Sequence, residues 1–220
     1  MIRFCLYKAV RLVGILIALG FPFVTHAQRL EVARFSAADM SGWKKKSFVG
    51  ETRYRLREDG DKQALYADSR AAASGLFREI EVDLDQMPYL HWTWKVENLV
   101  NGGDERGKQG DDYAARIYVV FSGGLLFWRT RAINYVWSSR ESPGSTWPNA
   151  FTANAQMIAV RSGPESLGTW LSERRDVKAD YQRLFGSEPG KIVAVALMTD
   201  TDNTKSAAVA WYGDIWFAAN

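Results

Sequence analysis

The sequence predicts an all-β fold in which two antiparallel sheets pack as a sandwich. Short runs of alternating apolar and polar residues recur along it, turn-forming residues separate them at regular intervals, and only one segment has helical spacing. A doubly wound α/β fold would need helices between the strands, and the sequence lacks them. We therefore expect a jelly-roll-like sandwich, with a single β-barrel as the alternative.

The N-terminal residues precede this expected domain. Arg3, Lys8 and Arg11 form a basic start, residues 12–24 are an apolar run, and Ala27 is a small residue after it. This layout is typical of a secretory signal peptide, so we expect residues 1–27 to be removed and residues 28–220 to form one β-sandwich domain. The apolar run is shorter than the ~20 residues of a membrane helix, although an uncleaved anchor is the alternative. We expect a periplasmic or secreted protein with no membrane span after cleavage.

Removal of residues 1–27 changes the composition of the remaining chain. It takes away the one cysteine, Cys5, and three of the 28 Lys and Arg residues, which leaves 25 basic residues against 25 acidic ones. A nucleic-acid partner is not expected, because a nucleic-acid-binding domain usually carries a basic excess. A zinc site is improbable, since His91 is then the one histidine. The sequence leaves the oligomeric state open.

Up to ten segments have the alternation of β-strands. Asp59-Gly60 marks a hairpin turn between the second and third, and a Gly-rich charged loop at residues 101–112 separates the fifth from the sixth. In chain order, the predicted strands are residues 29–35, 53–56, 64–67, 74–82, 89–96, 113–121, 132–138, 156–161, 191–198 and 209–217.

Residues 177–185 are the predicted helix. Val177 and Tyr181 recur at helical spacing, Asp176 is a suitable N-cap, and Gly186 stands where a C-terminal glycine belongs.

One predicted sheet face is unusually rich in polar and aromatic residues. An ordinary solvated face carries Lys, Glu, Thr and Ser, whereas this mixture suits a sheet on which aromatic rings stack against sugars and charged groups bind hydroxyls or acidic sugar groups. The alternative is that Arg116 and Asp214 form a paired, partly buried structural couple. The predicted ligand-binding residues are Lys95, Arg116, Tyr118, Asn134, Tyr212 and Asp214, with Trp137 as a possible stacking partner.

Tryptophans beside the loops have two interpretations. Trp128 and Trp147 would form a stacking platform if exposed. Because Trp is highly buried on average, we favour a core position for each of Trp128, Trp137 and Trp147.

Acidic loops offer hard oxygen ligands. Asp200, Asp202 and Asn203 resemble part of a calcium site, to which Asp111 and Asp112 would contribute only if the fold joins the two loops. The spacing does not match an EF-hand. We favour a solvated turn over a calcium site, and we expect no other metal or cofactor.

Catalysis is possible but unspecific in this sequence. A glycosidase needs two carboxyl groups, which Asp111, Asp112, Asp202 or Asp214 would supply. A polysaccharide lyase needs a base, and the candidates are Tyr118, Tyr212 or His91 beside Arg116 or Lys95. No nucleophile-elbow motif, phosphate loop or dinucleotide fingerprint is present.

Several strings together resemble the bacterial family called domain of unknown function 3047. They are residues 110–121, 134–137, 175–181, 198–204 and 212–215, and the resemblance spans about residues 35–217. It implies an exported bacterial protein with no established activity, and its signature strings include Asp111, Asp112, Arg116, Asp200, Asp202, Asn203 and Asp214. Separately, the rhythm of residues 73–96 is similar to carbohydrate-binding-module or galactose-binding-like jelly rolls, a likeness at the level of the fold.

These observations favour an exported sandwich that binds a glycan or another polar envelope ligand without cleaving it. The alternatives are a polysaccharide-active hydrolase or lyase that uses the same cluster, and a structural or interaction protein in which the cluster only stabilises the fold.

Overall fold

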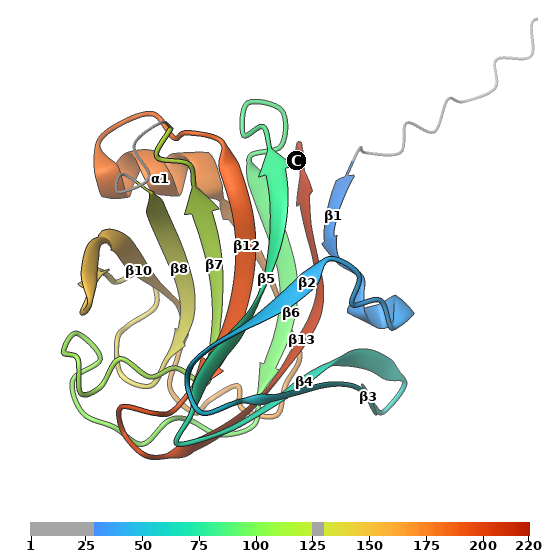
Figure 1. Cartoon of the computed structure of the whole chain (residues 1–220), viewed down its shortest axis with the longest axis vertical. Coiled ribbons are helices and arrows are strands. Elements are labelled where there is room, and N and C mark those ends of the chain that lie inside the picture. The colour runs from blue at the N-terminus through green and yellow to red at the C-terminus, as the bar shows by residue number, and fades with distance from the viewer. Residues whose placement is uncertain (1–28, 125–129) are drawn as a thin grey trace, which may run out of the picture.

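The structure, a computed structural model, describes residues 29–124 and 130–220. The expected signal peptide and Trp128 lie outside these residues. Within them, the strands form two sheets that pack face to face, and one α-helix lies at the end of the sandwich (Figure 1). The predicted all-β sandwich with a single short helix is therefore confirmed. No helix in the described ranges has the length and apolar character needed to cross a membrane.

We call the first of the two sheets sheet I. All its strand pairs are antiparallel, and β1 (Arg29–Ala33) joins it by pairing with β13. Its remaining strands, from one edge to the other, are β11 (Leu171–Asp176), β6 (Tyr89–Val96), β13 (Ala207–Ala218), β4 (Lys62–Arg70) and β3 (Arg53–Asp59).

We call the second sheet sheet II. Its strands, from edge to edge, are β2 (Trp43–Val49), β5 (Ala73–Val82), β12 (Ile192–Asp200), β7 (Ala115–Phe121), β8 (Arg131–Ser138), β10 (Thr152–Ser162) and β9 (Thr146–Asn149). Its pairs are antiparallel except for β8 and β10, which run parallel. The sequence predicts antiparallel pairs only, so this parallel pair is a departure from the prediction. It arises because β9 lies between β8 and β10 in the chain and runs antiparallel to β10, so that β10 runs in the same direction as β8.

The core lies between the two sheets and follows from the alternation of each strand. Leu90, Trp92 and Trp94 of β6 are fully buried, and they face residues of sheet II such as Tyr135, whose ring centroid is 5.4 Å from that of Trp92. Burial of a side chain of this size contributes about 1.5–3 kcal/mol. Because successive strand residues point to opposite faces, the neighbours of the inward residues form the two outer faces of the sandwich.

Helix α1 (Val177–Phe185) has the predicted bounds and caps. The Asp176 carboxylate accepts a hydrogen bond from the Ala179 amide at 2.9 Å, and Gly186 ends the helix with a φ of +62°. Tyr181 packs on Phe121 with ring centroids 4.5 Å apart. In Figure 1, α1 lies at the end of sheet II opposite to the loops of residues 101–112 and 201–206.

A β-bulge in β13 changes the alternation of the closing strand. Tyr212 pairs with Trp94 and Ile215 pairs with Trp92, so two residues of β13 stand opposite the single residue Thr93. Tyr212 and Ile215 are therefore both buried in the core, whereas Asp214 points outward from sheet I. The predicted face that joined Tyr212 to Asp214 is wrong, because strict alternation does not account for the bulge.

Candidate functional site

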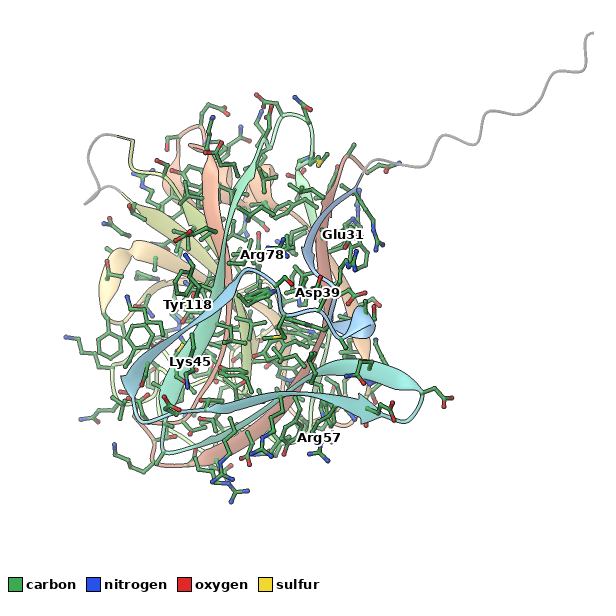
Figure 2. The ribbon with its side chains drawn as sticks, turned by 45° about the vertical axis from the view of Figure 1, so that its right-hand side comes forward. Glu31, Asp39, Lys45, Arg57, Arg78 and Tyr118 are labelled. Atoms are coloured by element: carbon green, nitrogen blue, oxygen red, sulfur yellow. The ribbon has the colours of Figure 1, made fainter. Side chains whose placement is uncertain are left out.

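The outer face of sheet II carries a groove of about 490 Å³. Arg116 and Tyr118 point into it because Ile117, between them on β7, points into the core. In Figure 2, Tyr118 of β7 is labelled to the left of β5, whereas Arg57 of β3 is labelled at the lower right, toward the other sheet. The groove is lined by residues of β2, β5, β7, β8, β9, β10 and β12 and by the loops that follow β9, precede β7 and follow β12.

A smaller depression of about 290 Å³ adjoins the groove. The two share Phe48, Tyr118 and Met198. The depression is hollow because its floor is made of small residues, among them Gly75 of β5. A Cβ atom at Gly75 would lie 2.9 Å from the Leu197 carbonyl oxygen, so a side chain there would force the strands to shift.

Arg116 is the central charged residue of the groove and is buried. Its guanidinium forms an ion pair with Asp200 and lies 3.8 Å from a carboxylate oxygen of Asp111. The guanidinium carbon is 5.1 Å from the ring centroid of Tyr113 and 5.4 Å from that of Tyr118. These four neighbours fix the orientation of the side chain, because each is itself held by a strand or by the loop before β7.

Asp112 joins the two acidic loops. One carboxylate oxygen accepts hydrogen bonds from the backbone and side-chain amides of Asn203, both at 3.2 Å. The other accepts from the backbone amide and hydroxyl of Thr204, at 2.6 and 2.7 Å. The two loops predicted to hold acidic ligands are therefore adjacent, and the hydrogen bonds to Asp112 hold them together.

The carboxylates of this site have raised pKa values. Burial raises the pKa of Asp111, and burial raises that of Asp200 well above its ordinary value in spite of the nearby guanidinium. Burial and the neighbouring carboxylate of Asp112 raise the pKa of Asp202, which is only partly buried. For each of these three groups, burial makes the charged carboxylate less favourable than it is in water.

Asn134 of β8 lines the groove with an amide that has no partner among the described residues. The residue is 1 % exposed, and neither its oxygen nor its nitrogen forms a hydrogen bond. An unpaired buried amide is destabilising by about 1–3 kcal/mol. A buried amide of this kind needs a partner such as an ordered water, an ion or a ligand.

Aromatic side chains form the rim of the groove. Phe48 is 61 % exposed and Phe151 is 58 % exposed, and Val49 beside Phe48 is 45 % exposed. Across residues 29–124 and 130–220 these are the exposed large hydrophobic residues, and all three line this one groove. Exposed apolar side chains that gather at one place mark a binding surface.

The structure brings together a large part of the predicted site. Arg116, Tyr118 and Asn134 share the outer face of sheet II, as predicted from their strands. They line the groove together with the loop candidates Asp111, Asp200, Asp202 and Asn203. Asp112 does not line the groove itself, but it accepts a hydrogen bond from Asn203, which does.

Lys95 and Asp214 do not belong to this face. Lys95 lies on sheet I, where its Nζ is 2.6 Å from Oδ2 of Asp59 and 2.9 Å from Oε1 of Glu97. Asp214 accepts hydrogen bonds from the amide and hydroxyl of Ser36, at 2.8 and 2.5 Å. The prediction of one shared face is wrong for these two residues, because alternation separates the two faces of a strand but does not say which sheet it joins. The alternative couple of Arg116 with Asp214 is also wrong, since Arg116 pairs with Asp200.

The aromatic candidates other than Tyr118 lie away from the groove. Trp137 and Tyr212 are buried in the core between the sheets. Trp147 does not line the groove, but it is on the outer face of sheet II, where it is buried against Met157 in a separate cluster. The preference for core positions is therefore confirmed for the two tryptophans that the structure describes. His91 lies on the outer side of sheet I, where its ring stacks on Trp216 with centroids 5.2 Å apart.

A metal ligand set can be drawn from the acidic loops. Asp112, Asp200 and Asp202 each offer one oxygen atom, and these atoms lie within 4.8 Å of one another. Asp112 already accepts four hydrogen bonds and Asp200 is paired with Arg116. Both contacts compete with a divalent ion, so the geometry favours the turn interpretation over a calcium site.

Sequence reasoning missed several groove residues. Phe48 follows three lysines and one serine, and Phe151 lies between polar segments, so each is an isolated aromatic residue in a hydrophilic context. An aromatic residue surrounded by polar ones in the sequence is a signal of an exposed ring, and this signal could have identified both residues. Asn149, whose amide donates to both oxygens of Asp111 at 3.0 and 3.2 Å, carried no comparable signal.

Comparisons with known proteins agree with this fold. Residues 41–216 match the family model described as a protein of unknown function, DUF3047. Among curated proteins, no sequence matches.

Solved structures of similar fold are distant in sequence. The family 30 carbohydrate-binding module of the cellulosomal cellulase Cel9D-Cel44B of Clostridium thermocellum is 9% identical, with a TM-score of 0.50 over 88% of this chain and 98% of that one. A family 29 carbohydrate-binding module is 9% identical, with a TM-score of 0.43 over 89% and 90%. The carbohydrate recognition domain of Emp47p is 9% identical, with a TM-score of 0.46 over 86% and 94%. At such identity the likeness to the family 30 module concerns the fold alone.

Proposed function

Because this chain belongs to the DUF3047 family, whose function is unknown, we propose its function from the groove: the protein binds a glycan on the outer face of sheet II without cleaving it. We propose that this binding occurs in the periplasm or outside the cell, because the sequence predicts a signal peptide.

The gathering of exposed aromatic residues carries this proposal. Phe48 and Phe151 come from segments about a hundred residues apart, yet both line the groove with most of their surface exposed. Exposure of a large apolar ring is unfavourable unless a partner covers it. The C–H faces of a sugar ring suit such a partner, because the face of an aromatic ring is electronegative and C–H groups are weakly positive.

The polar floor supports the same ligand class. Arg116, Asp111 and Asn149 present donors and acceptors along the groove, and Asn134 has both amide atoms unpaired. A few fixed polar groups beside apolar walls orient a small ligand. A sugar carries several hydroxyl groups, each of which donates and accepts. The likeness in fold to a carbohydrate-binding module is consistent with this ligand class.

Two features favour binding over cleavage. Burial raises the pKa of Tyr118, so its phenolate is scarce at neutral pH and the residue is a poor base for a lyase. Asp214, one of the predicted carboxyl partners, lies on sheet I. The experiment also distinguishes this proposal from its two alternatives, a polysaccharide-active enzyme and a purely structural protein.

Binding to a broad glycan panel, followed by calorimetry, tests the proposal. The protein is produced from the full-length gene, together with the variants Phe48→Ala and Phe151→Ala. Each variant should weaken binding by about three- to tenfold, as expected for loss of one stacking contact. Both residues are exposed, so the thermal midpoint should hardly change.

Tyr89→Ala supplies the matched control, because Tyr89 lies on the outer side of sheet I. It should leave glycan binding unchanged. Absence of binding across the panel would favour the structural alternative, and release of reducing ends or unsaturated uronates would favour an enzyme. Equal losses in all three variants would remove the groove from the proposal.

A further inference from the structure

The charges that line the groove are unbalanced. Asp111, Asp200 and Asp202 contribute three carboxyl groups, and Arg116 is the one cationic side chain among the described lining residues. Its guanidinium already contacts Asp200 and Asp111 and lies between two tyrosine rings. An anionic ligand would have to displace these contacts, so the groove is poorly suited to an acidic sugar.

Three lysines near the groove do not reverse this balance. Lys205 is an exposed residue of the same loop as Asp202, and its charge acts on the Asp202 carboxylate without forming an ion pair with it. Lys46 lines the adjoining depression and lies over the ring of Phe48 at 5.3 Å. Lys108 lies over the ring of Phe151 at 5.6 Å. Both are exposed side chains at the rim, where solvent and salt weaken their effect on the floor.

Asp202 is the carboxylate best placed to receive a cation. It is only partly buried, whereas Asp111 and Asp200 are buried. Its oxygen accepts a 3.4 Å hydrogen bond from Asn203, and the nearby carboxylate of Asp112 adds to the negative potential. Close like charges are unfavourable, and a neighbouring cation relieves them.

Asn134 is an independent indication that the same groove receives a polar ligand. Its amide is buried, lines the groove, and has both polar atoms unpaired within the described chain. The acidic loop and the unpaired amide therefore belong to one cavity, which is also bounded by the exposed rings of Phe48 and Phe151.

We propose that the glycan bound in this groove carries free primary amino groups, and that the Asp202 carboxylate receives an ammonium group of an amino sugar. This inference rests on the proposed glycan binding and specifies its ligand class. An ammonium group fits better than a divalent metal, because it needs only hydrogen-bond acceptors and one net negative charge. The carboxylates already paired with Arg116 and with Asn203 and Thr204 can then stay as they are.

Oligosaccharides of one length and linkage, which differ only in one substituent, test this inference. The series contains glucosamine with a free amine, its N-acetylated form, glucose and glucuronic acid. Calorimetry is done at low salt and at a pH where the amine is protonated. The free amine should bind about tenfold more tightly than the N-acetylated form, the uronate should bind most weakly, and added salt should reduce the preference.

Asp202→Asn should reduce the preference for the free amine to within about twofold. Asp61→Asn makes the same change of charge in the exposed turn between β3 and β4 and should preserve the preference. Equal or tighter binding of the N-acetylated form by the unmodified protein, or an unchanged preference in Asp202→Asn, overturns the inference. If neutral sugars bind without a preference for the amine, this inference fails while the proposed function stands. If no oligosaccharide of this series binds, this inference fails, and if the broad glycan panel also shows no binding, the proposed function fails with it.

Discussion

The outer faces of the two sheets treat their polar groups differently. On sheet I, Lys95 is paired with Asp59 and Glu97, Lys62 lies 3.8 Å from the ring centroid of Trp170, and Asp214 is bonded to Ser36. On sheet II, the Asn134 amide is unpaired and exposed rings border a groove. A mixture of charged and aromatic residues is therefore informative about a candidate site only where a polar group lacks a partner among the described residues, as Asn134 does.

Of the changes considered, removal of the Arg116 charge should have the largest effect on the free energy of unfolding. Arg116→Met leaves Asp200 buried without its partner and should lower the free energy of unfolding by about 3–5 kcal/mol. Lys95→Met on sheet I should cost only about 1 kcal/mol, since Asp59 and Glu97 are partly solvated. Urea denaturation of both variants measures the two values. A larger loss for Lys95→Met would reverse the assignment of the two faces.

Asp202 at the groove and Asp59 on sheet I should also respond to pH in opposite directions. The raised pKa of Asp202 means that its stabilising contribution is full below the unfolded pKa and is lost as pH rises through the folded value. The hydrogen bond from Lys95 lowers the pKa of Asp59, so its contribution is full above the unfolded pKa and is lost as pH falls through the folded value.

Asp202→Asn should therefore raise stability at neutral pH, by less than about 1 kcal/mol, and reduce the decline toward higher pH. Asp59→Asn should lower stability at neutral pH and reduce the decline toward acid. Thermal melting of the two variants across a pH series measures both slopes. Slopes of the same sign would contradict the difference between the faces.

Calcium should have the smallest effect. Because Asp112 is fully engaged by Asn203 and Thr204, we expect no measurable shift of the thermal midpoint on addition of calcium or of a chelator. A rise that saturates with calcium and disappears in Asp202→Asn would instead show that the acidic loops hold an ion.

Much of the fold could be predicted from the sequence, and the strands that were missed share a physical reason. β2, β9 and β11 are all edge strands. An edge strand has a neighbouring strand on one side only, so it can carry consecutive charged residues. β2 has three lysines in a row and β11 has four charged residues in a row, and both lack the alternation that buried strands require. The helix was predicted with its bounds because Asp176 and Gly186 cap it through local contacts.

The site was predictable only where the information was local. Arg116, Tyr118 and Asn134 were found together because β7 and β8 are neighbours in sheet II. The assignment of Lys95 to the other sheet depends on strand pairing over long distances, which alternation does not encode. The position of Tyr212 depends on a bulge, where Gly213 leaves no room for a Cβ atom beside the Thr93 hydroxyl.

The hydrogen bonds that Asp112 accepts from Asn203 and Thr204 limit how the loops of this protein family can vary. Two loops some ninety residues apart share one set of hydrogen bonds, so neither can change its length or backbone path without releasing the other. An exchange of loops between relatives would need to transfer residues 101–112 and 201–206 as a pair. The shape of this end of the groove therefore depends on two segments at once.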